Sequence, residues 1–258
     1  MGLKKFNIYT MKYDIEIIKK VVGDFKNGKN KSQLSKEYNI PRATLKYWIQ
    51  NESTIKVKRT SDKSIEVIID DIKSKKSVYN FILGLYLGDG NISRNKMSYK
   101  LRIVQDSKYK NSIKEICKEL KYFFGKNPTI QNSQGCKIIT IHDKNLPLYF
   151  PQHGVGKKHN RKIELVDYQT ENIDYESLLK GLWISDGSFY KAILSEKYSY
   201  ERYNFTNKSV DIISLFEECL RKIDVRYTKD VRKDLVLRIQ IQKKSEVDKM
   251  KKVVGIKS

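Results

Sequence analysis

Two short apolar segments of the chain share nearly the same pattern of hydrophobic and polar positions. Residues 82–90 read Ile-Leu-Gly-Leu-Tyr-Leu-Gly-Asp-Gly, and residues 179–187 read Leu-Lys-Gly-Leu-Trp-Ile-Ser-Asp-Gly. Each has small residues four positions apart, which lie on one face of a helix, and each ends in Asp-Gly. The repeat predicts two copies of one module, each of which supplies one carboxylate at a helix end.

Small residues inside these two predicted helices require a structural explanation. Glycine inside a helix costs about 1 kcal/mol relative to alanine, whereas small residues four apart let a second backbone approach closely. We therefore expect the helices to pack together and to bring Asp89 and Asp186 side by side. Two such carboxylates repel each other, and a divalent cation would relieve that repulsion. The alternative is that each Asp-Gly pair only forms a turn.

After each segment, strand-like and helix-like stretches follow in the same order. In the first copy we expect helices at 78–88 and 108–123, strands near 99–104, 129–130 and 137–141, and a helix or turn near 144–150. In the second we expect helices at 175–185, 209–223 and 245–253, with strands near 189–194, 201–206, 226–229 and 235–241. This order predicts two pseudo-symmetric αββαββα repeats, an α+β fold.

The first fifth of the chain has the 3.6-residue apolar period of helices. Short helices at about 32–38 and 42–50, joined by Asn39-Ile40-Pro41, resemble a helix-turn-helix of the resolvase or transposase type. In that interpretation the start of the second helix faces a DNA major groove, with Arg42, Thr44, Lys46 and Tyr47. An ordinary helical hairpin is the alternative. Residues 51–76 are polar and basic, with one apolar patch at 65–69.

These patterns divide the chain into a helix-turn-helix domain (1–52), a basic linker (53–76) and the two repeats (77–165 and 166–258). The sequence holds 52 Lys and Arg against 30 Asp and Glu, a net charge of +22, which favours a polyanionic partner such as nucleic acid. A lysine-rich protein from an AT-rich genome is the alternative. The three cysteines form no C-x-x-C pair, and no run approaches 18 apolar residues. We expect no membrane partner and an intracellular location, in the cytoplasm or nucleoid.

Taken together, the doubled motifs resemble those of the LAGLIDADG homing endonucleases, in the single-chain form that is a monomer acting as a pseudo-dimer. The resemblance covers roughly residues 77–258. It implies a metal-dependent, site-specific endonuclease that hydrolyses double-stranded DNA beneath a saddle of two sheets. It implies Mg²⁺ (or Mn²⁺) bound by Asp89 and Asp186, with the backbone carbonyls of Gly88 and Ser185 as further metal contacts. Lys144 and Lys244 are the candidate catalytic lysines, each near the end of its repeat's last strand.

The same resemblance implies that strand residues read DNA bases. The candidates are Arg102, Gln105, Arg202, Asn204, Arg238 and Gln240. Between the repeats lies a basic cluster that we interpret as a phosphate clamp, the alternative being a solvated loop: Lys157, Lys158, His159 and Arg161.

Residues 150–163 and 198–212 resemble segments of free-standing prokaryotic proteins of this fold whose activity is poorly understood. A shared fold does not establish cleavage. Two other functions therefore remain: a non-cleaving, sequence-specific DNA-binding transcriptional regulator, and an RNA-binding maturase.

Overall fold

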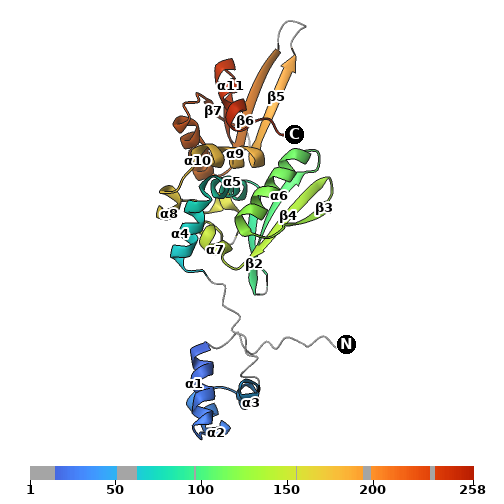
Figure 1. Cartoon of the computed structure of the whole chain (residues 1–258). Coiled ribbons are helices and arrows are strands. Elements are labelled where there is room, and N and C mark those ends of the chain that lie inside the picture. The colour runs from blue at the N-terminus through green and yellow to red at the C-terminus, as the bar shows by residue number, and fades with distance from the viewer. Residues whose placement is uncertain (1–14, 51–62, 96, 155, 194–198, 233–235) are drawn as a thin grey trace. The chain divides into compact units, whose positions relative to one another are not determined.

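Each of the two similar apolar segments forms a helix in the computed structural model, which describes residues 15–50, 63–95, 97–154, 156–193, 199–232 and 236–258. The first is α5 (Lys76–Leu87), in which every residue from Tyr79 to Leu87 is buried, and the second is α9 (Tyr175–Asp186). The two helices lie side by side in the middle of residues 62–258 (Figure 1). Because an isolated helix that is apolar on all sides would be unstable in water, this mutual burial explains their composition.

Each helix is followed by a four-stranded antiparallel sheet. The first sheet contains β1 (Gly90–Asn95), β2 (Ser98–Asp106), β4 (Cys136–Asp143) and β3 (Thr129–Ser133), in that order. The second contains β5 (Gly187–Ile193), β6 (Ser199–Asn207), β8 (Leu237–Ile241) and β7 (Thr228–Val231). Further helices complete the repeats: α6 (Lys110–Phe124) and α7 (Leu146–Tyr149) in the first, α10 (Val210–Lys222) and α11 (Lys244–Val253) in the second. The α+β class and the two αββαββα repeats are confirmed.

The two sheets have equivalent registers. Gly90 pairs with Ile103 in the first sheet, and Gly187 pairs with Phe205 in the second. Alternate residues of the central strands are buried against the helices, at 2% exposure or less: Leu101, Ile103, Ile139 and Ile141, and Tyr203, Phe205, Ile239 and Ile241. Successive strand side chains point to opposite faces, so the intervening residues form an outer face on each sheet. The inner faces and the helices share one hydrophobic core across both repeats.

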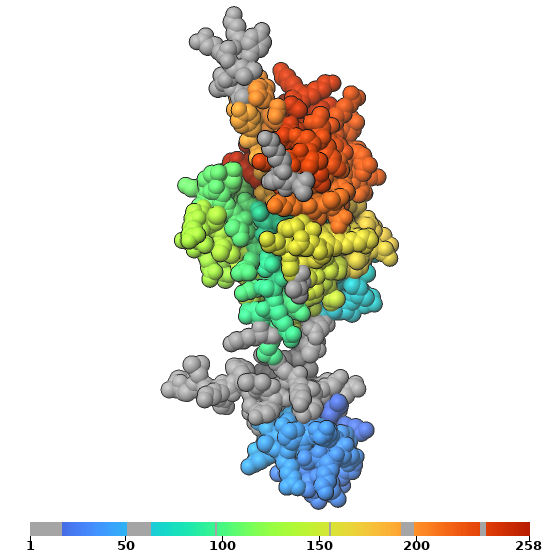
Figure 2. Space-filling model, turned by 180° about the vertical axis from the view of Figure 1, so that it is seen from behind, coloured from blue at the N-terminus to red at the C-terminus, as the bar shows by residue number. Residues whose placement is uncertain are grey.

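Between the repeats, residues 150–174 contain a 3₁₀ turn (Lys158–Asn160) and α8 (Asp167–Thr170). In the space-filling view, this yellow segment lies between the green first repeat and the orange to red second repeat (Figure 2). The repeats therefore form two halves of one compact unit, residues 62–258, rather than two separate bodies.

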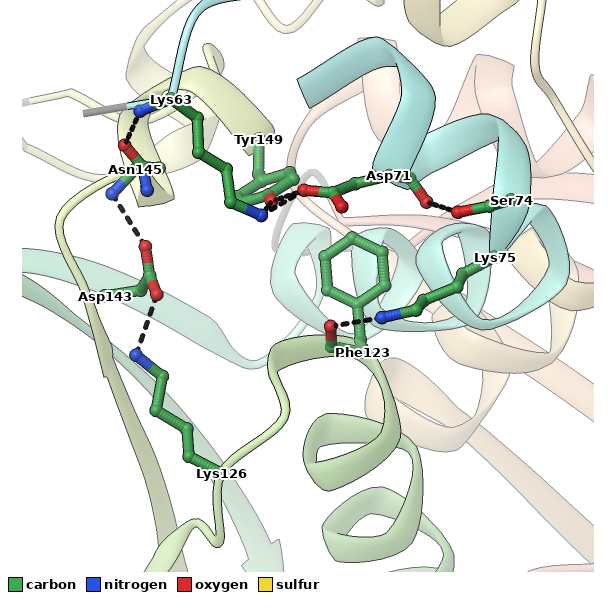
Figure 3. Close-up of polar contacts among 9 residues, drawn as sticks. All are labelled: Lys63, Asp71, Ser74, Lys75, Phe123, Lys126, Asp143, Asn145 and Tyr149. Carbon is green, nitrogen blue, oxygen red and sulfur yellow. Dashed lines mark hydrogen bonds and ion pairs between the residues drawn. The ribbon is translucent and has the colours of Figure 1, made fainter. Parts of the chain in front are cut away.

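Residues 65–74 correct the predicted linker. They form α4 (Ile65–Ser74), and its Ile68 and Ile72 are fully buried in the core of the repeats. Polar contacts fix the helix to the first repeat (Figure 3): Lys63 and Tyr149 both bind the Asp71 carboxylate, and Lys75 donates to the Phe123 carbonyl at 2.9 Å. The linker assignment was wrong here because the apolar period of α4 is only ten residues long. Residues 53–62 of the predicted linker lie outside the described residues.

The N-terminal unit contains α1 (Ile15–Lys26), α2 (Lys31–Glu37) and α3 (Arg42–Gln50). Asn30 caps α2, accepting from the backbone of Gln33, whose side chain accepts in return from the Asn30 backbone. The core of this unit is formed by Ile18, Val21, Val22, Leu34, Ile40, Leu45 and Trp48. The helix-turn-helix assignment stays a prediction. Among the described residues, no helix is both long and apolar enough to cross a membrane.

Candidate functional site

The two motif acids come together because their helices touch at small residues. A Cβ placed on Gly84 would lie 2.5 Å from the Leu178 carbonyl oxygen, closer than any side chain permits. One turn later, a Cβ on Gly88 would lie 3.0 Å from Oδ2 of Asp186. The acid of the second repeat therefore lies against the motif of the first, which is the juxtaposition that the doubled motif predicted.

The surroundings of both carboxyl groups raise their pKa values. Burial raises the pKa of Asp186 to about 6, and repulsion from Asp89 adds to the shift. Burial also raises the pKa of Asp89. The Asn207 side chain opposes the shift at Asp186 by donating to Oδ2 at 2.8 Å, and its own Oδ1 accepts from the Ser209 backbone at 2.7 Å. Asn207 thus orients one acid of the pair, and the sequence analysis missed it.

Lys158 enters this centre from the segment between the repeats. Its ammonium group donates to the carbonyl oxygens of Tyr86, Gly88 and Gly90, the last at 2.9 Å. An ammonium group has three donors, so these contacts use all of them. The same ammonium lies 5.2 Å from the centre of the Tyr86 ring. Burial lowers the pKa of Lys158 to about 8, although the charges of Asp186 and Asp89 oppose that shift.

Lys257 makes the matching contacts in the second repeat. It donates to the carbonyl oxygens of Ser185, at 3.0 Å, and of Gly187. It lies 5.5 Å from the Trp183 ring, which occupies the motif position of Tyr86. Burial lowers the pKa of Lys257 to about 8, against the opposing charges of Asp89 and Asp186. A cation at a helix C-terminus is also favoured by the helix dipole.

These contacts decide whether the centre fits the implied divalent metal. Magnesium takes oxygen ligands, and the resemblance implied that the carbonyls of Gly88 and Ser185 would supply two of them. Both carbonyls instead accept hydrogen bonds from lysine ammonium groups. Within the described residues, no group of three or more His, Cys, Asp or Glu side chains could hold a metal ion. With the lysines in these places, the carbonyls of Gly88 and Ser185 are bonded to ammonium groups, an arrangement that does not fit their use as ligands of Mg²⁺ or Mn²⁺.

The predicted catalytic lysines lie elsewhere. Ile139 faces Ile103, the strand neighbour of Gly90, and at about 3.3 Å per residue Lys144 lies roughly 16 Å further along. Lys244 begins α11 and is exposed at the corresponding end of the second sheet. Neither is among the charges that act on the two acids. Their catalytic assignment was wrong, because the centre lies at the opposite end of the central strands.

The predicted base-reading residues divide by strand face. Arg102 is exposed on the outer face of the first sheet, 3.4 Å from Oδ1 of Asn91. The other outer-face candidates form contacts among themselves and with neighbours: Arg202 donates to Gln242 at 2.9 Å, Arg238 pairs with Asp230, and Asn204 faces Gln240 across the strands. Gln105 is wrong as a base reader, since it is 4% exposed on the inner face and donates to the Ile184 carbonyl at 3.3 Å.

The residues of the predicted phosphate clamp lie in different environments. Lys157 and His159 are exposed. Arg161 donates to the carbonyls of Gly154, Gly156 and Gln152 at 2.8–3.1 Å, so it holds its own loop together. Lys158 points into the acidic centre. A cavity of about 340 Å³ lies beside this loop, and its wall includes Lys157, Lys158, His159, Arg161, Asp186 and Asn207.

In the N-terminal unit, Arg42 and Lys46 are exposed and Tyr47 is half-buried. Thr44 is corrected: it is 1% exposed, inside the core of the three helices, and cannot reach a DNA base there. It lies one position before the buried Leu45, and four before Trp48, on the same side of α3.

The lysines of the acidic centre had a signal in the sequence that we did not use. Val-Gly-Lys-Lys at 155–158 is repeated as Val-Gly-Ile-Lys at 254–257, after the last helix of each repeat. Gly156 and Gly255 both have positive φ, at 84° and 70°, where glycine is favoured. The second repeated motif thus places a lysine at its fourth position in both repeats, as the first repeated motif places one acid in each.

Among known proteins, the similarities to this chain are to solved structures. No family model matches the sequence, and no curated protein is similar to it. The solved structures similar to this chain include the homing endonuclease I-DmoI. A mesophilic variant of I-DmoI is 18% identical, with 70% of this chain and 96% of that chain covered and a TM-score of 0.49. I-DmoI in complex with DNA and Mn is 17% identical, with 70% and 97% covered and a TM-score of 0.49.

A variant of I-SmaMI is 12% identical, with 69% of this chain and 84% of that chain covered and a TM-score of 0.47. The matches are to the family that the doubled motifs resemble. The chemistry of the centre follows from the residues of this chain.

Proposed function

We propose that this protein is a sequence-specific DNA-binding regulator that binds duplex DNA along the outer faces of its two sheets and does not cleave it. The observation that carries the proposal is the occupancy of the acidic centre by Lys158 and Lys257. The net charge of +22 and the polar outer faces support DNA as the partner. The DNA would be read by Arg102 in the first sheet and by Asn204, at the equivalent register position, in the second.

One observation favours a second function, metal-dependent cleavage of the bound DNA. Asp89 and Asp186 remain paired at the helix ends, and two metal ions held by such acids can activate water and stabilise a leaving oxygen. The carbonyls that would complete such ligand sets are bonded to ammonium groups, so we place cleavage second.

Selection from a randomised duplex library separates the two functions. We expect the protein to retain a defined set of sequences equally well with Mg²⁺ and with EDTA, and to leave the strands intact. New strand ends at defined positions in Mg²⁺ or Mn²⁺, absent from Asp89→Asn and Asp186→Asn, would establish the endonuclease instead. The absence of any sequence preference would contradict both functions.

Matched variants test the interface itself. Arg102→Ala should weaken binding to the selected sequence by roughly 5- to 150-fold, since a bidentate contact to a base contributes about 1–3 kcal/mol. Lys118 is a control of the same charge: its side chain is 80% exposed on α6, which covers the opposite face of the first sheet. Lys118→Ala should leave the affinity within about twofold, because it faces no predicted phosphate.

A further inference from the structure

The acidic centre holds two carboxylates and two ammonium groups in a pseudo-symmetric arrangement. Each ammonium donates to carbonyls at the end of its own motif: Lys158 in the first, Lys257 in the second. Of the two, Lys158 acts more strongly on the charge of Asp186, and Lys257 acts more strongly on Asp89. Each lysine therefore contacts the carbonyls of its own motif, and its charge acts on the carboxylates of both motifs.

We propose that Lys158 and Lys257 are resident cations that take the places of divalent metal ions between the two motif acids. Each of these two cations binds the backbone carbonyls at one helix end, and its charge lies close enough to both carboxylates to act on them. An ammonium group can bind these carbonyls in place of a metal ion. All three N–H groups of Lys158 donate to carbonyl oxygens.

The two ammonium groups balance the charges of the two carboxylates. Two buried carboxylates without partners would be costly, and two ammonium groups bring the formal charge of the centre to zero. The aromatic rings of Tyr86 and Trp183 lie beside the two ammonium groups, at 5.2 and 5.5 Å, and add a favourable contact with each cation. In the proposed arrangement the carbonyls that would bind an added metal are already bonded to ammonium groups.

The positions of the lysines are built into the fold. Both follow a glycine of positive φ in the repeated Val-Gly-x-Lys sequence, and both enter the centre after the last helix of their repeat. The lysines form part of the duplicated unit, as the acids do. The occupancy of the centre by lysines does not depend on the proposed function. Its consequence, DNA binding that needs no divalent ion, rests on the proposed function.

Manganese binding by the full-length protein, without DNA, tests this proposal. After removal of metal with EDTA, Mn²⁺ is added and the free ion is followed by its paramagnetic resonance signal. We expect no stoichiometric uptake by the wild type. The Lys158→Met/Lys257→Met variant should gain uptake with a Kd on the order of 10⁻⁵ M, as expected for a site of carboxylate and carbonyl oxygens.

Two controls define the site. Lys144→Met/Lys244→Met removes the same charge at the far ends of the sheets and should bind no Mn²⁺. Adding Asp89→Asn and Asp186→Asn to the first variant should abolish the gained uptake. If the double variant does not fold, Lys257→Met alone serves, because it leaves every contact of Lys158 in place.

Uptake of Mn²⁺ by the wild type that is lost in Asp89→Asn would overturn the proposal. So would a folded lysine variant that gains no uptake, since the lysines would then not occupy cation sites. Failure of DNA binding leaves either result unchanged, so the two proposals fail separately.

Discussion

The backbone of Gly181 lies directly against that of Gly84: a Cβ on Gly181 would stand 3.0 Å from the Gly84 Cα and 2.1 Å from the Phe81 carbonyl oxygen. Because both neighbours are backbone atoms of a packed helix, neither can move aside without separating α5 from α9. We expect Gly181→Ala to lower the free energy of unfolding of residues 62–258 by about 3 kcal/mol, and the melting temperature by roughly 6–12 °C. Thermal unfolding measures this.

A glycine outside the helix contact provides the control. At Gly154 the nearest atom to an added Cβ is 3.6 Å away, an ordinary contact distance, and φ is not positive. Gly154→Ala should therefore leave the melting temperature nearly unchanged. Equal destabilisation by both substitutions would mean that the helix contact is not as close as described.

Gln105 should affect stability rather than DNA recognition. Its side chain donates to the Ile184 carbonyl on the inner face of the first sheet. In Gln105→Leu this buried carbonyl loses its partner, which should cost about 1–3 kcal/mol. The base preferences of the variant, measured by selection from the randomised library, should match those of the wild type. A changed preference would restore Gln105 as a base reader.

Two neighbouring residues of α3 should behave differently in DNA binding. Lys46 is exposed, and Lys46→Ala should weaken binding and reduce the slope of log affinity against log salt by about 1 if it contacts a phosphate. Thr44 is buried, and its hydroxyl has no hydrogen-bond partner. Thr44→Val should leave DNA affinity unchanged and stability equal or higher. Loss of affinity on Thr44→Val alone would contradict its burial.

Helix α4 should be required for the stability of the repeats. Ile72 is fully buried, and Ile72→Ala should lower the free energy of unfolding by about 2–5 kcal/mol. Val67, on the same helix, is 43% exposed, so Val67→Ala is the matched control with little expected effect. Urea unfolding of the full chain in a Trp48→Phe background, followed by the fluorescence of Trp183, distinguishes the two. Equal midpoints would mean that α4 does not belong to the core.

The acidic centre should give stability a pH dependence of unusual sign. The folded-state pKa of Asp186 is raised from 3.8 to about 6, so the folded protein holds this proton more tightly than the unfolded chain. The contribution of Asp186 to stability must therefore fall as pH rises from about 4 to about 6, by roughly 3 kcal/mol in all. Asp186→Asn removes this fall, so the stability of the variant relative to the wild type should increase over that range.

Lys158 and Lys257 should affect the pH dependence of stability at alkaline pH. Their pKa values are lowered from 10.5 to about 8, so their contribution to stability should rise as pH increases from about 8 toward 10.5. Asp224 is a control whose sign is opposite to that of Asp186, because Lys249 lowers the pKa of Asp224. The contribution of Asp224 is present in full above about pH 4 and is lost at lower pH, so Asp224→Asn should lose less stability than the wild type as pH falls below about 4. Denaturant unfolding from about pH 2 to pH 10 checks all three groups.

The sequence by itself determined the paired repeats. The motif, the order of elements and the closeness of Asp89 to Asp186 all follow from local patterns and from one duplication, so they could be predicted. Tertiary structure decided the rest. Arg102 and Gln105 lie on opposite faces of one strand, and only the position of the core shows which face is open. Thr44 and α4 were misjudged for the same reason, since burial depends on distant neighbours.

The centre shows the same limit most clearly. The acids lie within their motifs, but the lysines reach the motif carbonyls from segments about 70 residues further along the sequence. Val-Gly-x-Lys occurs twice in the sequence. The position of its lysine in the structure, however, depends on the path that the chain takes after the last helix of each repeat. That path is fixed by packing of the whole repeat, and it placed lysines where the sequence had suggested metal.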